Sequence, residues 1–148
     1  MADRFERFSL AIFEISRSWH RLAGEELGKY GLKSAHATYL TTMARFPEGI
    51  TAPRLGELCG KDKSDVSRMM SILEERGLAV KDGPGKNRYR GDIRLTEQGR
   101  QVAAQLRQRA ALAVERAGRG LSDDDRATFY DALETIADNL RAMSRSGL

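Results

Sequence analysis

The sequence predicts a mainly α-helical fold with one small β-hairpin. Apolar residues recur at helical spacing near both ends of the chain, and two short helix patterns follow each other closely in the middle. A segment rich in glycine, between two strand-like runs, indicates a hairpin. With 148 residues and 41% hydrophobic content, the chain is long enough for one compact domain but too short for two independent ones.

The first expected helix runs from Asp3 to about Gly28. Its apolar residues are separated alternately by three and four positions, which places them along one side of a helix, as in a coiled coil. We call this set the N-terminal seam; it contains Phe5, Phe8, Ile12, Ile15, Trp19 and Leu22.

Two short helices are expected in the centre of the chain. Thr51 is a suitable N-cap, Pro53 fits the first turn and Gly60 ends the pattern. The second helix is expected to begin at the cap candidate Ser64 and to end at Gly77. Its apolar side would carry Val66, either Met69 or Met70, and Leu73.

The opposite side of this second helix carries small polar and basic residues. They are Lys63, Ser64, Asp65, Ser67, Arg68 and Ser71. Small side chains let a helix approach the base edges of DNA, and an arginine such as Arg68 can form a bidentate contact to guanine. An ordinary solvated helix surface has a similar composition, so composition alone leaves both interpretations open.

The expected hairpin carries most of the excess positive charge. Strand-like runs at residues 79–81 and 92–95 flank a turn segment with three glycines and one proline. From residue 81 to residue 94 the net charge is +3, whereas the whole chain carries +4. Such a concentration of positive charge favours binding to a polyanion, because binding releases counterions. The alternative is an ordinary charged loop exposed to solvent. The basic residues are Lys81, Lys86, Arg88, Arg90 and Arg94.

Two more helices are expected after the hairpin. The first runs from Thr96 to about Ala117, and we expect it to be a spacer outside the core. The last begins at the cap candidate Ser122, followed by three aspartates that favour the helix dipole. Its apolar residues repeat the alternating spacing and form a C-terminal seam of Phe129, Leu133, Ile136, Leu140 and Met143. The two seams either pack on each other within one subunit or form a dimer interface.

These motifs resemble the MarR family of winged helix-turn-helix transcriptional regulators. The resemblance rests on the stretches LEERGL at residues 73–78, LTEQG at 95–99, YGL at 30–32, ATYL at 37–40 and KSDVSR at 63–68. It implies an N-terminal dimerisation helix in residues 1–32, a winged-helix DNA-binding region in 33–96, and a linking helix and C-terminal dimerisation helix in 97–148. The dimerisation residues would be Phe5, Phe8, Ile12, Ile15, Phe129, Leu133, Ile136 and Leu140.

The resemblance implies a homodimeric regulator, more commonly a repressor, that binds a pseudo-palindromic duplex. The polar side of the second central helix, from Ser64 to Ser71, would enter the major groove, and Arg88 or Arg90 would reach the minor groove. The residues expected at the DNA backbone are Lys63, Lys81 and Lys86. The alternative function is a winged-helix module that binds an acidic protein partner.

Two positions depart from the family pattern. Tyr89 stands where many relatives carry the wing arginine, so the sequence does not choose between its neighbours Arg88 and Arg90. Asp65 stands where relatives usually carry a small hydroxyl residue. A carboxylate there has three open roles: accepting from cytosine, capping the helix, or repelling phosphate.

The family often binds small anionic aromatic molecules between its dimerisation and DNA-binding parts. The candidates for such an effector site are Arg17, Trp19, His20 and Tyr39. An arginine with aromatic neighbours holds such a ligand by charge and stacking. The simpler explanation is that Trp19 belongs to the seam and that the arginines lie over it.

Several function classes lack support in the sequence. Cys59 is the only cysteine, so an intramolecular disulfide is excluded. We expect its side chain to have a packing role. The two histidines have no clustered ligands that would indicate a metal, and we find no catalytic or phosphate-loop motif, so we expect neither an enzyme nor a cofactor. We expect a cytoplasmic protein, because no apolar run approaches about 20 residues and the N-terminus lacks the pattern of a signal peptide.

Overall fold

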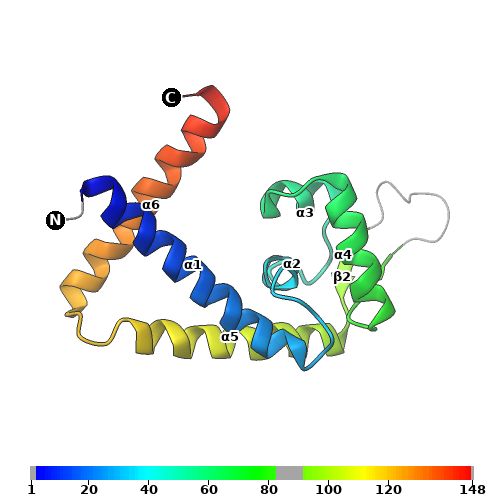
Figure 1. Ribbon diagram of the computed structural model, residues 1–148. Coiled ribbons are helices and arrows are strands. Elements are labelled where there is room, and N and C mark those ends of the chain that lie inside the picture. The colour runs from blue at the N-terminus through cyan, green and yellow to red at the C-terminus, as the bar shows by residue number, and fades with distance from the viewer. Residues whose placement is uncertain (1–2, 83–91, 148) are drawn as a thin grey trace. The chain divides into compact units, whose positions relative to one another are not determined.

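The computed structural model describes residues 3–82 and 92–147. In chain order, its elements are α1 (Arg4–Gly28), α2 (His36–Ala44), α3 (Ala52–Cys59), α4 (Lys63–Glu75), β1 (Ala79–Lys81), β2 (Ile93–Leu95), α5 (Glu97–Ala117) and α6 (Asp123–Ser146) (Figure 1). The predicted mainly α-helical fold with one small hairpin is confirmed. The chain forms two compact units, one up to Ala110 and one from Ala111 onward.

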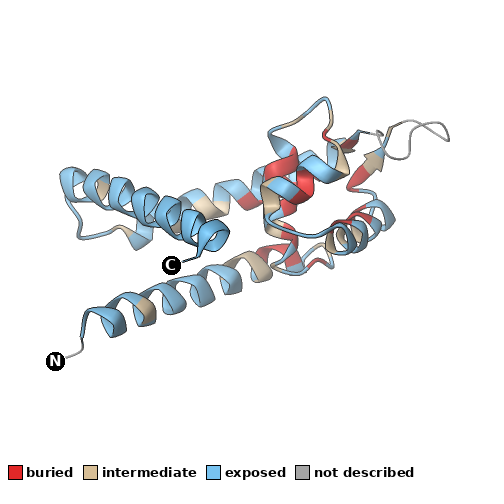
Figure 2. Cartoon of the chain, turned by 90° about the horizontal axis from the view of Figure 1, so that it is seen from above, coloured by how far each residue is buried: buried red, intermediate tan, exposed pale blue. Residues whose placement is uncertain are grey.

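The hydrophobic core lies in the first unit, and α1 to α5 all contribute to it. Figure 2 shows the buried residues gathered there, whereas α6 has no buried residue among those described. Of the two methionines that the sequence left as alternatives, Met70 is the buried one. The core includes Leu27, Tyr39, Leu40, Met43, Leu55, Met70, Leu73, Leu78, Ile93 and Leu106.

The expectation that the helix after the hairpin is a spacer outside the core is wrong for its first three turns. Gly99, Val102, Ala103 and Leu106 of α5 are buried. Leu27 in the last turn of α1 is also fully buried. Three short helices and a small hairpin offer little apolar surface by themselves, so α1 and α5 complete a core that extends beyond residues 33–96 on both sides.

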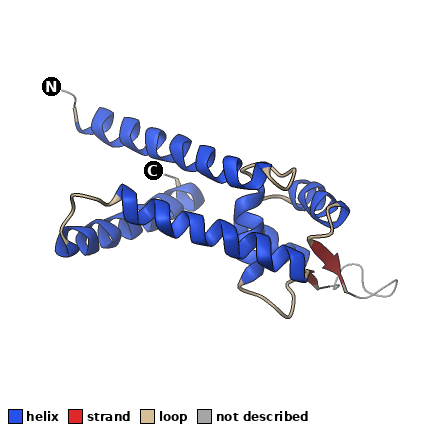
Figure 3. Cartoon of the chain, turned by 90° about the horizontal axis from the view of Figure 1, so that it is seen from below, coloured by secondary structure: helices blue, strands red, loops and turns tan. Residues whose placement is uncertain are grey.

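The two predicted strand runs form an antiparallel pair. Ala79 is opposite Leu95 and Lys81 is opposite Ile93. Figure 3 shows the two short strands in red. Ile50, in the loop between α2 and α3, pairs with the other edge of β2: its N–H donates to the Ile93 carbonyl (2.9 Å), and its carbonyl accepts from the Ile93 N–H (2.8 Å). The α2–α3 loop is therefore fixed to the base of the hairpin.

α4 ends at a glycine in the left-handed conformation. Gly77 has φ of 72°, and its N–H donates to the carbonyl of Glu74 (3.0 Å). The Leu78 N–H donates to the carbonyl of Leu73 (2.8 Å), which completes a Schellman motif with both leucines buried. The apolar residues on both sides of Gly77 thus help to turn the chain from α4 into β1.

The stretch from Leu95 to Gly99 turns the chain from β2 into α5. The Thr96 hydroxyl donates to the carbonyl of Gly77 (2.7 Å) and accepts from the backbone N–H of Gly99 (3.1 Å). The Thr96 N–H donates to the carbonyl of Leu78 (3.0 Å). A Cβ at Gly99 would lie only 2.0 Å from that carbonyl oxygen, so the start of α5 packs directly against the backbone before β1.

Both long terminal helices expose their apolar seams within the single chain. Asp3 caps α1, and Ser122 caps α6 as predicted. The exposed fraction reaches 73% at Phe5 in the N-terminal seam and 52% at Leu140 in the C-terminal seam. Leu10 and Phe13 of α1, which lie outside the seam, are also exposed. Apolar surface of this extent on two long helices is typical of a protein interface.

Candidate nucleic-acid interface

α3 and the turn that follows it position α4. Thr51 caps α3 as predicted, through an Oγ1 that accepts from the backbone N–H three residues on (3.3 Å). The Lys61 N–H donates to the carbonyl of Gly56 (2.8 Å). A Cβ at Gly56 would lie 2.9 Å from the Lys61 carbonyl oxygen and 3.1 Å from Val66 Cγ2. Glycine at this position therefore allows the tight turn of a helix-turn-helix.

The predicted cap of α4 is wrong. The N-cap is Asp62, whose Oδ1 accepts from the backbone N–H of Asp65 (2.8 Å), and Ser64 lies exposed in the first turn. Both residue types are suitable caps, but a carboxylate also interacts favourably with the helix dipole, which a hydroxyl cannot do.

The polar side of α4 faces solvent, and the apolar side faces the core. Val66, Met70 and Leu73 are buried at helical spacing. The structure brings the expected polar residues together on the opposite side, where only Asp65 is partly buried. The exposed residues on this side of α4 are Lys63, Ser64, Ser67, Arg68 and Ser71. We call these five the α4 polar face.

Asp65 binds within the protein. Its carboxylate accepts from the Tyr39 hydroxyl and from Arg68 Nη2 (3.4 Å). The Tyr39 hydroxyl, aided by Arg68, holds the pKa of Asp65 below its usual value, although partial desolvation acts against it. Burial and the adjacent carboxylate raise the pKa of Tyr39, so the phenol stays protonated and donates. Of the three roles left open for Asp65, capping is filled by Asp62.

In the described arms of the hairpin, one basic side chain is exposed and another forms an ion pair. Lys81 is exposed at the end of β1. Arg94 Nε donates to Asp82 Oδ2 (2.7 Å), and this carboxylate raises the pKa of Arg94. The charge of Arg94 is therefore balanced by an ion pair within the chain, at the protein surface. The expected DNA contacts of Lys86, Arg88 and Arg90 lie outside the described residues.

The effector candidates occupy two different environments. Arg17, Trp19 and His20 are exposed on α1, whereas Tyr39 is fully buried with its hydroxyl on Asp65. A cavity of about 260 Å³ lies between α2 and α5 of the first unit, and none of the four candidates lines it. Its lining residues are Thr41, Thr42, Ala44, Arg45, Ala103 and Arg107.

Two further polar side chains lie near the core. Cys59 packs against it as expected, with Sγ 3.6 Å from Thr42 Oγ1, and burial raises the pKa of the thiol. His36 is buried at the start of α2, and its Nδ1 accepts from the Lys33 backbone N–H (3.1 Å). Burial lowers the pKa of His36. Neither residue belongs to the α4 polar face.

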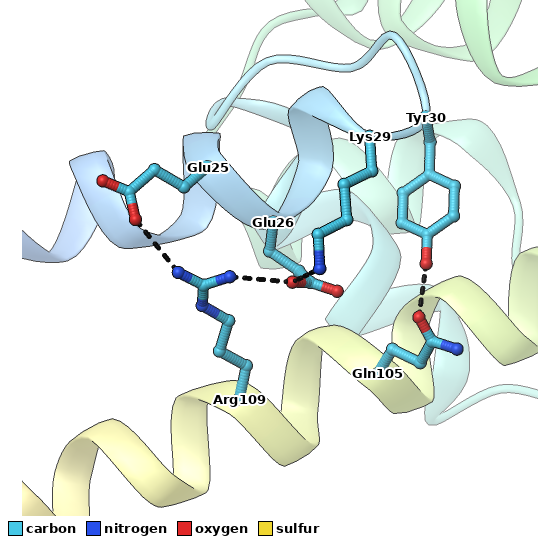
Figure 4. A network of polar contacts seen from close by, with 6 residues as sticks. All are labelled: Glu25, Glu26, Lys29, Tyr30, Gln105 and Arg109. Carbon is cyan, nitrogen blue, oxygen red and sulfur yellow. Dashed lines mark hydrogen bonds and ion pairs between the residues drawn. The ribbon is translucent and has the colours of Figure 1, made fainter.

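A polar network joins α1 to α5 (Figure 4). The Glu26 carboxylate, whose side chain is 5% exposed, accepts from Lys29 Nζ (2.7 Å) and Arg109 Nη1 (3.1 Å). Arg109 Nη2 also donates to the exposed Glu25 (3.0 Å). In the same view, the Tyr30 hydroxyl donates to Gln105. These contacts could not be predicted from the sequence, because helical spacing does not indicate which residues of two distant segments meet.

Replacing Glu26 by glutamine is expected to lower the free energy of unfolding by about 1–2 kcal/mol at pH 7, because the hydrogen bonds from Lys29 and Arg109 lose the negative charge that strengthens them. Lys29 and its neighbours lower the pKa of Glu26 in the folded protein. The stabilisation is therefore complete above the usual carboxylate pKa and is lost as the pH falls through the lower, folded value. Urea unfolding at pH 7 and near pH 3.5 measures this difference.

Glu25→Gln is the matched control, because Glu25 contacts the same Arg109 but is exposed. Exposed ion pairs contribute little to stability, so we expect the free energy of unfolding to change by less than about 0.5 kcal/mol. A Glu26→Gln effect that is equal at both pH values would contradict the assigned role of the carboxylate charge.

The described residues contain neither a membrane-spanning helix nor a cluster of metal ligands. Among the residues that the structure describes, no helix is long and apolar enough to cross a membrane. Within the same residues, no group of three or more histidine, cysteine, aspartate or glutamate side chains is placed to hold a metal ion.

Solved structures match the chain over nearly its whole length. A MarR transcriptional regulator from Methanosarcina mazei Go1 has 21% identity and a TM-score of 0.82, with 97% of this chain and 94% of that chain covered. A putative MarR family transcriptional regulator from Listeria monocytogenes, solved in complex with a 26mer DNA, has 21% identity and a TM-score of 0.78, with coverages of 99% and 97%. MarR itself has 24% identity and a TM-score of 0.80, with 99% of each chain covered.

Neither a family model nor a curated protein matches the sequence. The likeness is therefore one of three-dimensional structure, and it extends from α1 through the helix-turn-helix and hairpin to α6. In its fold, this chain is a MarR-type winged helix-turn-helix protein.

Proposed function

We propose that the chain is a MarR-family transcriptional regulator that binds a pseudo-palindromic DNA duplex as a homodimer. The observation that carries the proposal is the α4 polar face, which is exposed on the second helix of a helix-turn-helix while the opposite side is buried. Its small hydroxyl side chains and one arginine suit close approach to base edges. The DNA complex of the Listeria regulator, which shares the fold, supports the same kind of partner.

Each part of the proposed interface has a distinct role. Ser64, Ser67, Arg68 and Ser71 enter the major groove, where Arg68 contacts guanine. Lys63 and Lys81 lie toward the DNA backbone, as Lys86 does in the hairpin. Arg88 or Arg90 reaches the minor groove, whose negative potential attracts a guanidinium group.

A homodimer accounts for the exposed seams of the terminal helices. A two-fold dimer presents two copies of α4 about one DNA turn apart, which matches a pseudo-palindromic site. The seam residues proposed for the interface are Phe5, Phe8, Ile12 and Ile15 on α1 and Phe129, Leu133, Ile136 and Leu140 on α6. Burial of this apolar surface provides the driving force for association.

We also propose repression that is relieved by a small anionic aromatic effector. Arg17, Trp19 and His20 on α1 are the exposed side chains offered for its binding. An effector regulates only if it binds the DNA-competent and DNA-incompetent states of the dimer with different affinity.

Arg68→Ala is expected to lower the affinity for the preferred duplex by about 1–3 kcal/mol and to relax the sequence preference. Lys81→Ala is the matched control on the hairpin, and it should weaken binding to all duplexes similarly. The preferred duplex is first selected from a random pool with the wild-type protein. Fluorescence anisotropy then gives the affinity of each variant for this duplex and for a random duplex.

A salt titration tests whether duplex binding depends on phosphate contacts. Each neutralised phosphate contributes about −0.9 to the slope of log K against log salt. Failure to enrich any duplex, together with a flat salt dependence, would refute the proposed function. Equal losses for Arg68→Ala and Lys81→Ala on both duplexes would refute the assignment of Arg68 to base recognition.

A further inference from the structure

We propose that Tyr39 and Asp65 are positioning residues for Arg68, so that a buried hydroxyl on α2 sets the orientation of the arginine on the α4 polar face. This inference rests on the proposed function and extends it to residues behind the DNA-facing surface. The contacts that carry it run from Tyr39 to Asp65 and from Asp65 to Arg68.

The Tyr39 side chain is a fixed anchor. Tyr39 is fully buried in α2 and belongs to the main core cluster. A buried tyrosine ring is restricted by its packing, and its hydroxyl usually has one partner. Here the partner is the Asp65 carboxylate, 26 residues further along the chain. The position of this carboxylate is therefore set by the core.

Asp65 transmits this position to the surface. One carboxylate oxygen accepts from Tyr39 and the other faces Arg68 Nη2 at 3.4 Å. The Asp65 side chain is 20% exposed, and the Arg68 side chain is 73% exposed. An ion pair between two mobile surface side chains contributes little free energy, because both side chains lose conformational entropy when the pair forms. When the core already holds the carboxylate, only the arginine has to be ordered, and the bound orientation is prepared in advance.

The same arrangement accounts for an acidic residue on a helix that is proposed to face phosphate groups. The hydroxyl of Tyr39 and the guanidinium of Arg68 use both carboxylate oxygens. A carboxylate that is satisfied in this way has less capacity to accept from a cytosine amino group. Asp65 is thus assigned to positioning and not to direct base recognition.

Tyr39→Phe removes only the hydroxyl group and tests the inference directly. We expect about a five- to tenfold loss of affinity for the selected duplex and less than a twofold change for a random duplex, because base recognition depends on the arginine orientation. In a double-mutant cycle with Arg68→Ala, the effect of Tyr39→Phe should disappear, since no arginine remains to be oriented.

Tyr30→Phe is the matched control. It also removes a tyrosine hydroxyl that donates to a residue far along the chain, but Tyr30 lies in the turn after α1 and its partner is Gln105 on α5. We expect no change in duplex selectivity and additivity with Arg68→Ala. Thermal unfolding of each variant accompanies the binding measurements, and both phenylalanine variants should be fully folded at the temperature of the binding assay.

Asp65→Asn provides a second route should Tyr39→Phe fail to fold. It retains an acceptor for Tyr39 but loses the negative charge that faces Arg68. Affinity for the selected duplex should fall several-fold, whereas affinity for a random duplex should rise, because a charge near phosphate is removed. The loss should again vanish when Arg68 is already alanine.

The outcomes separate this inference from the proposed function. If the wild-type protein enriches no duplex, both fail. If it enriches a duplex but the Tyr39 or Asp65 effect is additive with that of Arg68→Ala, or no selectivity is lost, only the positioning role is overturned. Loss of selectivity that is absent in the Arg68→Ala background supports it.

Discussion

Replacing Gly99 by alanine is expected to lower the free energy of unfolding by about 3 kcal/mol, because overpacking against backbone atoms is among the costliest single substitutions. A Cβ at this position would lie 2.0 Å from the carbonyl oxygen of Leu78 and 2.9 Å from its carbonyl carbon. Neither atom belongs to a flexible side chain, so α5 or the segment before β1 must move. Movement would also disturb the Thr96 N–H bond to the same carbonyl.

Gly28→Ala is the matched control for this substitution. Gly28 is also helical, but a Cβ there would have no neighbour within 4 Å. Because alanine reduces the conformational freedom of the unfolded chain, we expect unchanged or slightly higher stability, by up to about 1 kcal/mol. Urea unfolding followed by far-UV circular dichroism, at one protein concentration, compares the variants. Similar stability of Gly99→Ala and wild type would refute the close packing at the start of α5.

An aspartate at position 15 is expected to abolish the proposed homodimer. Ile15 lies in the middle of the N-terminal seam and is 58% exposed in the single chain. In a dimer that buries the seam, Ile15→Asp places an unpaired charge in an apolar interface, which costs several kcal/mol, or more than about 100-fold in the dimer dissociation constant. Sedimentation equilibrium should show the wild type at twice the chain mass of 16.5 kDa and the variant at that mass.

Leu10→Asp is the control for the effect of a new charge on α1. Leu10 is 65% exposed and, at 100° per residue, lies nearly opposite the seam. We expect this variant to remain dimeric. Dissociation of both variants would place both sides of α1 in the interface, whereas a monomeric wild-type protein would refute the homodimer. The dissociated Ile15→Asp variant should also lose affinity for the selected duplex, because two linked helices bind more tightly than one.

The sequence predicted those features that depend on neighbouring residues. The caps Thr51 and Ser122 act on N–H groups within the next turn, so their positions follow from local sequence. The strand runs predicted at 79–81 and 92–95 also depend on local sequence, and the structure has strands at 79–81 and 93–95. The cap of α4 was missed because Asp62 and Ser64 both have the required residue type, and only the structure shows which one meets a free N–H.

Contacts between distant residues could not be predicted in this way. As an aromatic residue, Tyr39 is an effector candidate in the sequence, but its position in the core and its bond to Asp65 depend on the packing of α2 against the other helices. The burial of Val102 and Leu106 likewise depends on which elements α5 meets. The α4 polar face is exposed as expected, while its role in binding DNA, and that of Lys86, Arg88 and Arg90, stays a prediction.

The pairing of Ile50 with Ile93 also bears on the solubility of the protein. With Ile50 on one side and β1 on the other, β2 has hydrogen-bonding partners along both edges. The outer edge of the described sheet is then β1, which is only three residues long and ends in Lys81. Short edges that carry lysine discourage pairing with strands of other molecules. The described base of the hairpin is thereby protected from aggregation.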